Sequence, residues 1–159
     1  MDEVRLEGGC SCRRVRYRIG VAPIVVHCCH CTLCQRQTGT AFVLNALVET
    51  DRLVVLGDEP RRYDMPTESG RPHGIYRCEA CGIAVWSEYS GNTALRFVRV
   101  GTLDAPAALP PDVHIFVRSK LPWVVLPEGA RAYDLFYDPK TDLPAASLER
   151  WRASRRVTP

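Results

Sequence analysis

Apolar and polar side chains alternate along several short stretches of the chain, which is the pattern of half-buried β-strands. The clearest stretch spans residues 14–19, where Val15, Tyr17 and Ile19 alternate with three arginines. We therefore expect a strand with one apolar face and one solvated arginine face. Further apolar runs predict strands at residues 41–48, 53–56, 83–89, 95–101, 113–117 and 123–126.

Polar residues between these runs predict how the strands connect. Residues 49–52 predict a hairpin between the two runs that flank them, and residues 64–74 predict an exposed loop. A turn at residues 90–92 predicts a second hairpin between its own flanking runs.

Helical patterns are short and occur twice. Residues 32–37 predict one or two helical turns that end at Gly39, and apolar residues recur near helical spacing at residues 144–152. The sequence therefore predicts a mainly β protein with short helical turns. We expect one domain over residues 1–140 and a C-terminal tail over residues 141–159 that forms a short helix.

Size and charge narrow the class of protein. The chain has 159 residues, of which 46% are hydrophobic and 25% are charged, and this balance suits one globular domain. Its formal net charge of +3 is small, so we expect no nucleic-acid partner. No apolar run approaches the roughly 20 residues that span a membrane. The acidic opening, Met1-Asp2-Glu3, does not resemble a signal peptide, and we expect a cytoplasmic protein.

The chain has eight cysteines, and a hydrophobic core does not need thiols packed as densely as they are here. Four of them lie in residues 27–34, HCCHCTLC, together with two of the four histidines. The others form the pairs Cys10-x-Cys12 and Cys78-x-x-Cys81. Disulfides are rare in a reducing compartment, whereas thiolates and imidazoles at these spacings are the ligands that zinc prefers. The pattern predicts metal sites.

The two outlying pairs can form one closed site. Alternate residues of a strand share a face, so Cys10 and Cys12 can point at one metal ion. Cys78 and Cys81 are followed by Gly82, which allows the backbone to fold around a metal as in a zinc knuckle. Four thiols would make a structural site that joins the N-terminal strand to a central hairpin. Spacing alone leaves open which pairs meet.

The cluster at residues 27–34 offers more ligands than one site needs. Cys29, Cys31 and Cys34 can supply three thiolates from the end of a strand and the turn that follows it. The spacing of Cys28 and Cys31 is equally suitable for a metal. Because adjacent residues of a strand point in opposite directions, only one of Cys28 and Cys29 should face the ion.

A fourth ligand would decide whether this site is structural or catalytic. Structural zinc has four protein ligands, whereas catalytic zinc has three and keeps one position open. If Cys28, His27 or His30 completes the site, the site is closed. If none of them does, a substrate thiol or water can bind the metal.

Several motifs follow one another along the chain. They are GGCSC and VRY within residues 8–17, CHCTLCQR at 29–36, CEACG at 78–82, GTLD at 101–104, HIFV at 114–117 and KLPW at 120–123. This ordered set resembles the glutathione-dependent formaldehyde-activating enzyme family, also called the centromere-protein-V/GFA domain. The resemblance implies an Mss4-like fold, in which antiparallel sheets with short helical turns surround zinc knuckles.

The resemblance also implies a role for each cysteine. The four ligands of a structural zinc ion correspond to Cys10, Cys12, Cys78 and Cys81. The three ligands of a catalytic zinc ion correspond to Cys29, Cys31 and Cys34. Cys28 lies outside the motif, and we expect it to be an extra thiol.

The implied activity is that of a carbon–sulfur lyase, which joins formaldehyde to glutathione as S-(hydroxymethyl)glutathione. Its partners would be small molecules, namely glutathione or another thiol and an aldehyde. An open three-thiolate site suits this reaction, because zinc deprotonates a bound thiol and the thiolate is the nucleophile. The alternatives are a non-catalytic zinc module that binds a protein or another macromolecule, and a methionine sulfoxide reductase that uses Cys28.

Overall fold

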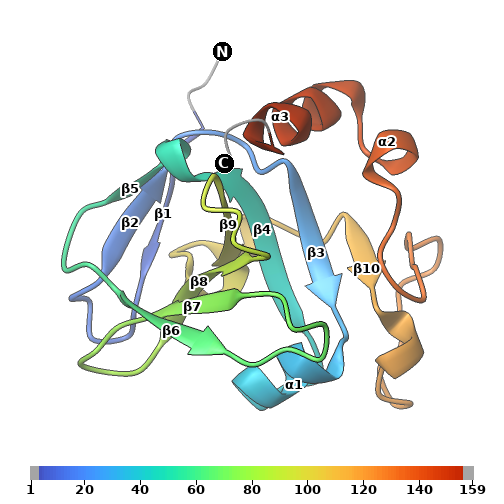
Figure 1. The fold of residues 1–159 in the computed structure, drawn as a ribbon, viewed down its shortest axis with the longest axis horizontal. Coiled ribbons are helices and arrows are strands. Elements are labelled where there is room, and N and C mark those ends of the chain that lie inside the picture. The colour runs from blue at the N-terminus through green and yellow to red at the C-terminus, as the bar shows by residue number, and fades with distance from the viewer. Residues whose placement is uncertain (1–3, 156–159) are drawn as a thin grey trace.

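Two β-sheets and a few short helices make up residues 4–155, the part of the chain that the computed structural model describes (Figure 1). The strands are β1 (Leu6–Gly9), β2 (Arg16–Ile19), β3 (Val25–Cys29), β4 (Val43–Glu49), β5 (Leu53–Val55), β6 (Arg61–Met65), β7 (His73–Arg77), β8 (Ala84–Tyr89), β9 (Leu95–Arg99) and β10 (Val113–Ile115). The small sheet has the order β1-β2-β5 and the large sheet the order β10-β3-β4-β9-β8-β7-β6. The mainly β architecture predicted from the sequence is confirmed.

The helices are short and lie at the ends of the large sheet. They are α1 (Thr32–Thr38), α2 (Pro139–Asp142) and α3 (Ala145–Arg155), with the 3-10 turns η1 (Thr50–Arg52), η2 (Val100–Thr102), η3 (Pro106–Ala108) and η4 (Val117–Ser119). Figure 1 shows α1 at one end of β3 and β4, and α3 at the other. Within residues 4–155, no helix has the length and apolar character that crossing a membrane requires.

The alternating stretch near the N-terminus forms β2 with the predicted faces. Tyr17 and Ile19 are fully buried, whereas Arg16 and Arg18 lie on the opposite face of the strand. Arg16 donates two hydrogen bonds to the carboxylate of Asp104, at 2.8 and 2.6 Å. The arginine face is therefore a solvated surface with ion pairs.

The predicted hairpin between residues 41–48 and 53–56 is wrong, although both strands exist. β4 pairs with β3 and β9 in the large sheet, whereas β5 pairs with β2 in the small sheet. A short connection usually joins strands that pair with each other. Here both edges of β4 are already occupied, so β5 has no free edge to pair with. It packs instead against the core between the two sheets.

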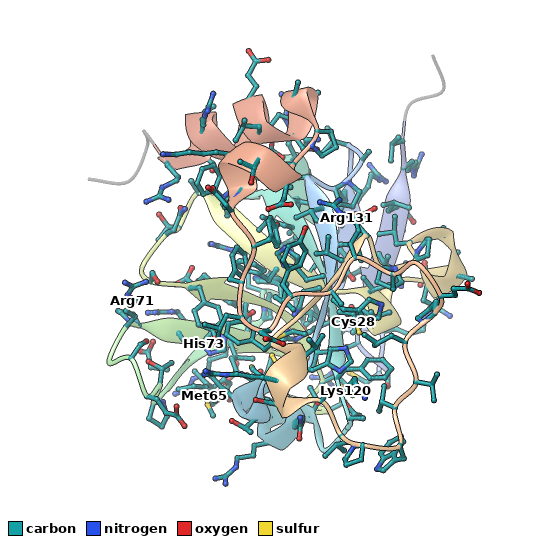
Figure 2. The ribbon with its side chains drawn as sticks, turned by 90° about the vertical axis from the view of Figure 1, so that its right-hand side faces the viewer. Cys28, Met65, Arg71, His73, Lys120 and Arg131 are labelled. Atoms are coloured by element: carbon teal, nitrogen blue, oxygen red, sulfur yellow. The ribbon has the colours of Figure 1, made fainter. Side chains whose placement is uncertain are left out.

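The predicted loop at residues 64–74 is shorter than expected. Its two ends belong to β6 and β7, an antiparallel hairpin whose last pair is Met65 and His73. Figure 2 shows this hairpin at the side of the molecule, with Arg71 at its outer end. The prediction failed because β6 is an exposed edge strand, and its polar side chains have the composition of a loop.

The strands predicted near residues 113–126 differ most from the structure. β10 is only three residues long and pairs in parallel with β3, so one pair of the large sheet departs from the expected antiparallel arrangement. Just beyond it, Phe116 has a φ of 57°, and the left-handed conformation stops the extended chain. Residues 123–126 form no strand, and Trp123 and Val125 are 71% and 88% exposed. Prolines on either side of this segment cannot donate to a ladder.

Three other predicted elements are confirmed. β8 and β9 form the expected hairpin, and α1 ends at Gly39, whose φ is 67°. α3 forms in the predicted tail, where Arg150 donates to the carboxylate of Glu49 at 2.7 and 2.6 Å. Residues 156–159 of that tail lie outside the described residues, and the division between a domain at 1–140 and the tail stays a prediction.

The large sheet has a core on each face. One face packs against the small sheet, where Tyr17 meets Trp86 edge-on with ring centroids 5.6 Å apart. On the other face, side chains of β3, β4 and β10 pack against the C-terminal segment, which contributes Tyr137 and Leu143. Cysteines of one predicted site border the first core, and those of the other border the second. The fold therefore separates the two cysteine groups.

A substitution of Gly8 tests how closely the small sheet is packed. A Cβ atom here would come within 2.5 Å of the Tyr17 hydroxyl and of the backbone oxygen of Thr102. We expect Gly8→Ala to lower the free energy of unfolding by about 1–3 kcal/mol, because this backbone oxygen cannot easily move. Urea unfolding monitored by tryptophan fluorescence measures the loss.

Gly20→Ala is the matched control, since nothing lies within 4 Å of a Cβ at this position. We expect it to change stability by less than about 1 kcal/mol. Equal unfolding midpoints for the two variants would contradict the packing argument.

Candidate metal centres and active site

The two outlying cysteine pairs meet in the structure. Their Sγ atoms all lie within 4.8 Å of one another, and they belong to Cys10, Cys12, Cys78 and Cys81. The Sγ–Sγ distance is 3.4 Å between Cys10 and Cys12, and 3.6 Å between Cys12 and Cys78. A tetrahedral zinc ion with Zn–S bonds of about 2.3 Å holds its sulfurs roughly 3.8 Å apart. The spacing of these thiols therefore suits such an ion.

Each pair sits on a tight turn with a left-handed residue directly after its second cysteine. Arg13 follows Cys12 with a φ of 65°, and Gly82 follows Cys81 with a φ of 75°. The positive φ expected of Gly82 is confirmed, and Arg13 adopts the same conformation without being a glycine. These turns aim backbone N–H groups at the sulfurs, and the hydrogen bond from Ile83 lowers the pKa of Cys81 to about 6. Such groups stabilise the thiolates that metal binding requires.

Three cysteines from the end of β3 and the start of α1 form a second group, again within 4.8 Å. Cys29 is the last residue of β3, and Cys31 caps the N-terminus of α1, whose first turn contains Cys34. The backbone N–H of Cys34 donates to the Cys31 Sγ at 3.3 Å. The side-chain amide of Gln35 fixes the turn by donating to two backbone carbonyl oxygens, at 2.8 and 2.9 Å.

This second group readily carries a negative charge. Hydrogen bonds from Cys29 and Cys34 lower the pKa of Cys31 to about 2. The hydrogen bond with Cys31 in turn raises the pKa of Cys29. One thiolate is therefore stabilised by two protonated neighbours, and a bound cation would replace both of those protons.

A buried guanidinium group lies near these thiols and forms no ion pair with a carboxylate of the described residues. Arg99 is 6% exposed, and it donates to Asn45 Oδ1 and, at 2.7 Å, to Gln37 Oε1. Burial lowers its pKa, while the charge of Cys34 acts in the opposite direction. Three thiolates around a divalent ion leave one excess negative charge. With such an ion bound, the charge of Arg99 would balance it.

The stacked rings of His73 and Tyr89 lie next to the polar groups around Arg99. His73 and Tyr89 have ring centroids 3.9 Å apart, with 24° between the ring planes. Gln37 Nε2 lies 3.5 Å from His73 Nδ1, so the amide links the stacked pair to Arg99. Burial lowers the pKa of His73 to about 4 and raises that of Tyr89, and the charge of Cys34 raises the latter further. Both rings are therefore neutral at pH 7.

The sequence motifs did not identify these polar residues. His73 fell in a predicted loop, and Asn45 and Arg99 fell in predicted core strands. The register places Asn45 opposite both His27 and Arg99, so one row across β3, β4 and β9 carries all three. The only available signal was the presence of an asparagine and an arginine within otherwise apolar runs.

None of the three candidates for a fourth ligand joins the second group. His27 Nε2 lies 2.7 Å from the hydroxyl of Tyr137 in the C-terminal core. Cys28 and His30 lie together with His114 in a separate group. Among the described residues, the second group therefore offers three cysteines that could hold a metal ion, and no fourth His, Cys, Asp or Glu joins them.

A surface cavity of about 430 Å³ opens next to α1. Its lining includes Gln37 and Thr38 of α1, Arg99 of β9, and Arg77 and Gly82 of the hairpin that carries the CxxC motif. Arginine binds carboxylates through two parallel hydrogen bonds. The arginines in the lining therefore suit an acidic ligand, and the lining contains none of the three cysteines of the second group.

Residues 5–119 match the family described as glutathione-dependent formaldehyde-activating enzyme. The chain belongs to this family. The resemblance inferred from the ordered motifs is confirmed, and the two sheets agree with the Mss4-like fold class that it implied.

Two individual proteins are similar to this chain. A Halomonas elongata protein with the provisional name of glutathione-dependent formaldehyde-activating enzyme is 28% identical over 156 residues, which cover 93% of this chain and 94% of that protein. A crystal structure of a Rhodobacter sphaeroides protein gives a TM-score of 0.48 at 20% identity, over 62% of this chain and 87% of that one.

The buried imidazole of His27 should make the stability of the protein depend on pH. Burial lowers its pKa to about 4, below the value of about 6.5 expected in the unfolded chain. Between these values the unfolded state binds more protons, so stability falls as the pH drops through this range. From pH 7.5 to pH 5 we expect the wild type to lose about 2 kcal/mol more than His27→Gln, which cannot be protonated. Urea unfolding at both pH values measures the difference, and identical losses would contradict the argument.

Proposed function

We propose that the protein is a zinc-dependent carbon–sulfur lyase that joins formaldehyde to the thiol of glutathione, giving S-(hydroxymethyl)glutathione. Family membership supports the reaction class. The proposal rests on the group of Cys29, Cys31 and Cys34, which offers three thiolates and has no fourth protein ligand among the described residues. A site of this kind leaves a coordination position for the substrate thiol.

The other cysteine group has the features of a closed structural site. Its four thiols come from the turn before β2 and from the hairpin of β7 and β8. A zinc ion held by all four would cross-link these distant segments, and its binding free energy would contribute to folding. One zinc ion would then be structural and the other catalytic.

The chain's own groups bind and orient the reactants. When bound at the open site, zinc supplies the positive charge that keeps a substrate thiol deprotonated at neutral pH. In the overall reaction the sulfur bonds to the formaldehyde carbon, and the carbonyl oxygen takes up a proton. Arg77 lines the surface cavity next to α1, where its guanidinium can bind a carboxylate of glutathione. Holding the thiolate and the aldehyde together supplies most of the acceleration, because three thiolates weaken the Lewis acidity of the metal.

Tyr89 is our candidate for a hydrogen-bond donor to the oxygen of the aldehyde. Burial and the charge of Cys34 raise its pKa, so the phenol keeps its proton at pH 7. A protonated hydroxyl near the thiols can donate a hydrogen bond to the oxygen as negative charge develops there.

A second candidate function is a non-catalytic zinc module that binds another protein. The segment after η4 exposes Trp123 and Val125, at 71% and 88%, and Phe136 is 47% exposed. Large apolar side chains that form one contiguous exposed patch are typical of contact surfaces. The two functions differ in their need for an open metal site, and the activity measurement below separates them.

Replacement of single cysteines should separate catalysis from folding. Cys31→Ser should remove one equivalent of zinc and abolish the acceleration of exchange between glutathione and formaldehyde, while the circular dichroism spectrum stays unchanged. Exchange NMR measures the rate. A fully zinc-loaded wild type that gives no acceleration above the uncatalysed rate would refute the lyase proposal.

The matched variant in the other group is Cys81→Ser. It should also remove one equivalent of zinc, but we expect a fall in melting temperature of about 10 °C or more, because several kcal/mol are lost at roughly 2–4 °C per kcal/mol. Equal melting temperatures for the two variants would contradict the division into structural and catalytic sites.

Substitutions of Arg99 test whether its positive charge balances the thiolates of the open site. Arg99→Met leaves the excess negative charge of the three thiolates unbalanced, and we expect it to weaken zinc binding there by about 10–100-fold. Arg99→Lys keeps the charge and should retain most of the affinity. Competition with a zinc-binding dye measures both variants. Wild-type affinity in Arg99→Met would show that the guanidinium does not act on the metal site.

A further inference from the structure

A third group of metal-binding side chains lies outside both cysteine sites. The ligand atoms of Cys28, His30 and His114 are within 4.8 Å of one another, and all three residues are buried, at 2%, 0% and 8% exposure. The Cys28 Sγ lies 3.5 Å from His30 Nε2, which is 3.1 Å from His114 Nδ1. One thiol and two imidazoles therefore converge on one point inside the fold. Cys28 lies in the interior on the side of the molecule that Figure 2 shows.

Regular backbone pairing brings the three side chains together. In the parallel pair of β3 and β10, His114 lies directly opposite Cys28, and paired residues share a face of the sheet. His30 is two residues beyond Cys28, and its backbone N–H donates to the carbonyl oxygen of Ile115 at 3.0 Å, which continues the pairing past the end of β3. On the other edge of β10, the backbone N–H of His114 donates to the carbonyl oxygen of Arg131 at 2.7 Å. The site is thus built on a rigid framework.

This group is separate from the open three-thiol site, although the two are adjacent in sequence. Successive side chains of a strand point to opposite faces. Cys29 packs in the core that the C-terminal segment covers, whereas Cys28 points to the other face of β3. The two thiols cannot bind the same ion.

Hydrogen bonds within the group do not account for its burial. Both polar contacts of the His30 ring use Nε2, and its Nδ1 is buried without a partner among the described residues. The ring of Phe42 lies beside it, with centroids 5.5 Å apart, and contributes no hydrogen-bonding group. Placing an unpaired imidazole nitrogen in such surroundings costs free energy. Coordination of a metal ion through Nε2 is an interaction strong enough to offset that cost.

We propose that Cys28, His30 and His114 hold a third metal ion of the zinc type, which cross-links β10 to β3. Two imidazole nitrogens and a thiolate are borderline-soft ligands, which favour zinc over magnesium or calcium. Zn–N bonds of about 2.0 Å and Zn–S bonds of about 2.3 Å place tetrahedral ligand atoms roughly 3.3–3.6 Å apart. The observed separations of 3.1 and 3.5 Å are close to these values.

The ion would support a weak edge of the large sheet. β10 is an edge strand of only three residues, and such short pairing contributes little stability by itself. The segment that follows β10 carries Ser119, whose carbonyl oxygen accepts a hydrogen bond from Gln35 of α1 at 2.9 Å. A link between β10 and β3 would therefore also hold the helix that carries the open site.

Metal stoichiometry tests the proposal independently of enzymatic activity. Zinc-free protein is reconstituted with Zn²⁺ and, separately, with ¹¹³Cd²⁺, whose NMR shift rises with the number of sulfur ligands. We expect three equivalents per chain and three ¹¹³Cd resonances, one of them in the range of a site with one sulfur and two nitrogens. A wild type that saturates at two equivalents, or that gives no such resonance, overturns the proposal.

Variants assign the third resonance to its ligands. Cys28→Ala and His114→Gln should each bind two equivalents and lose only that resonance, whereas Cys31→Ser should lose a different one. The control is His27→Gln, which removes an equally buried imidazole of the same strand and should still bind three equivalents. If Cys28→Ala and His114→Gln fold and keep the third resonance, the proposal is wrong. If neither folds, the wild-type measurement alone decides. A failure of the lyase assay has no bearing on any of these results.

Discussion

The pairing of β3 with its two neighbours is the constraint on which two of the three candidate sites depend. β4 and β10 hold this strand on both edges, and the alternation along it then determines where each side chain of the HCCH stretch goes. His27 and Cys29 face the C-terminal core, where one meets Tyr137 and the other meets the thiols of α1. Cys28 faces the opposite side and meets two histidines. A shift of the register by one residue would exchange these partners and dismantle all of the groups that β3 carries.

Charge explains why the interior tolerates so many ionisable groups. A buried arginine without a carboxylate partner is costly, and so are three thiolates in one place. Together with a divalent ion, the three thiolates and the guanidinium would neutralise each other, which would allow both to be buried on the same side of the sheet. The side-chain oxygens of Asn45 and Gln37 accept hydrogen bonds from two nitrogens of the guanidinium without adding charge, whereas its buried Nε has no partner among the described residues. His73 and Tyr89 remain neutral because burial disfavours their charged forms.

The two cysteine groups differ in how far apart in the sequence their residues lie. The four-thiol group joins two turns that are far apart in sequence, so it exists only when both sheets are in place, and a metal bound there would favour the folded chain. The three-thiol group is nearly local, since β3, the N-cap of α1 and the first turn of that helix supply every ligand. A local group does not need its metal to define the fold. With a metal bound, this independence would leave a fourth coordination position free for chemistry.

The sequence by itself determined the features that depend on neighbouring residues. Alternation in β2, the turns around both cysteine pairs, α1 with its terminal glycine and the helix in the tail all follow from spacing and local conformation. The cysteine motifs also identified the family. Tertiary structure decided everything that depends on which strand lies beside which: β5 joins the small sheet because β4 has no free edge, and β10 runs parallel to β3. Only this pairing brings His73, Arg99 and His114 to their sites, because residues distant in the chain become neighbours through register, and no local pattern encodes that register.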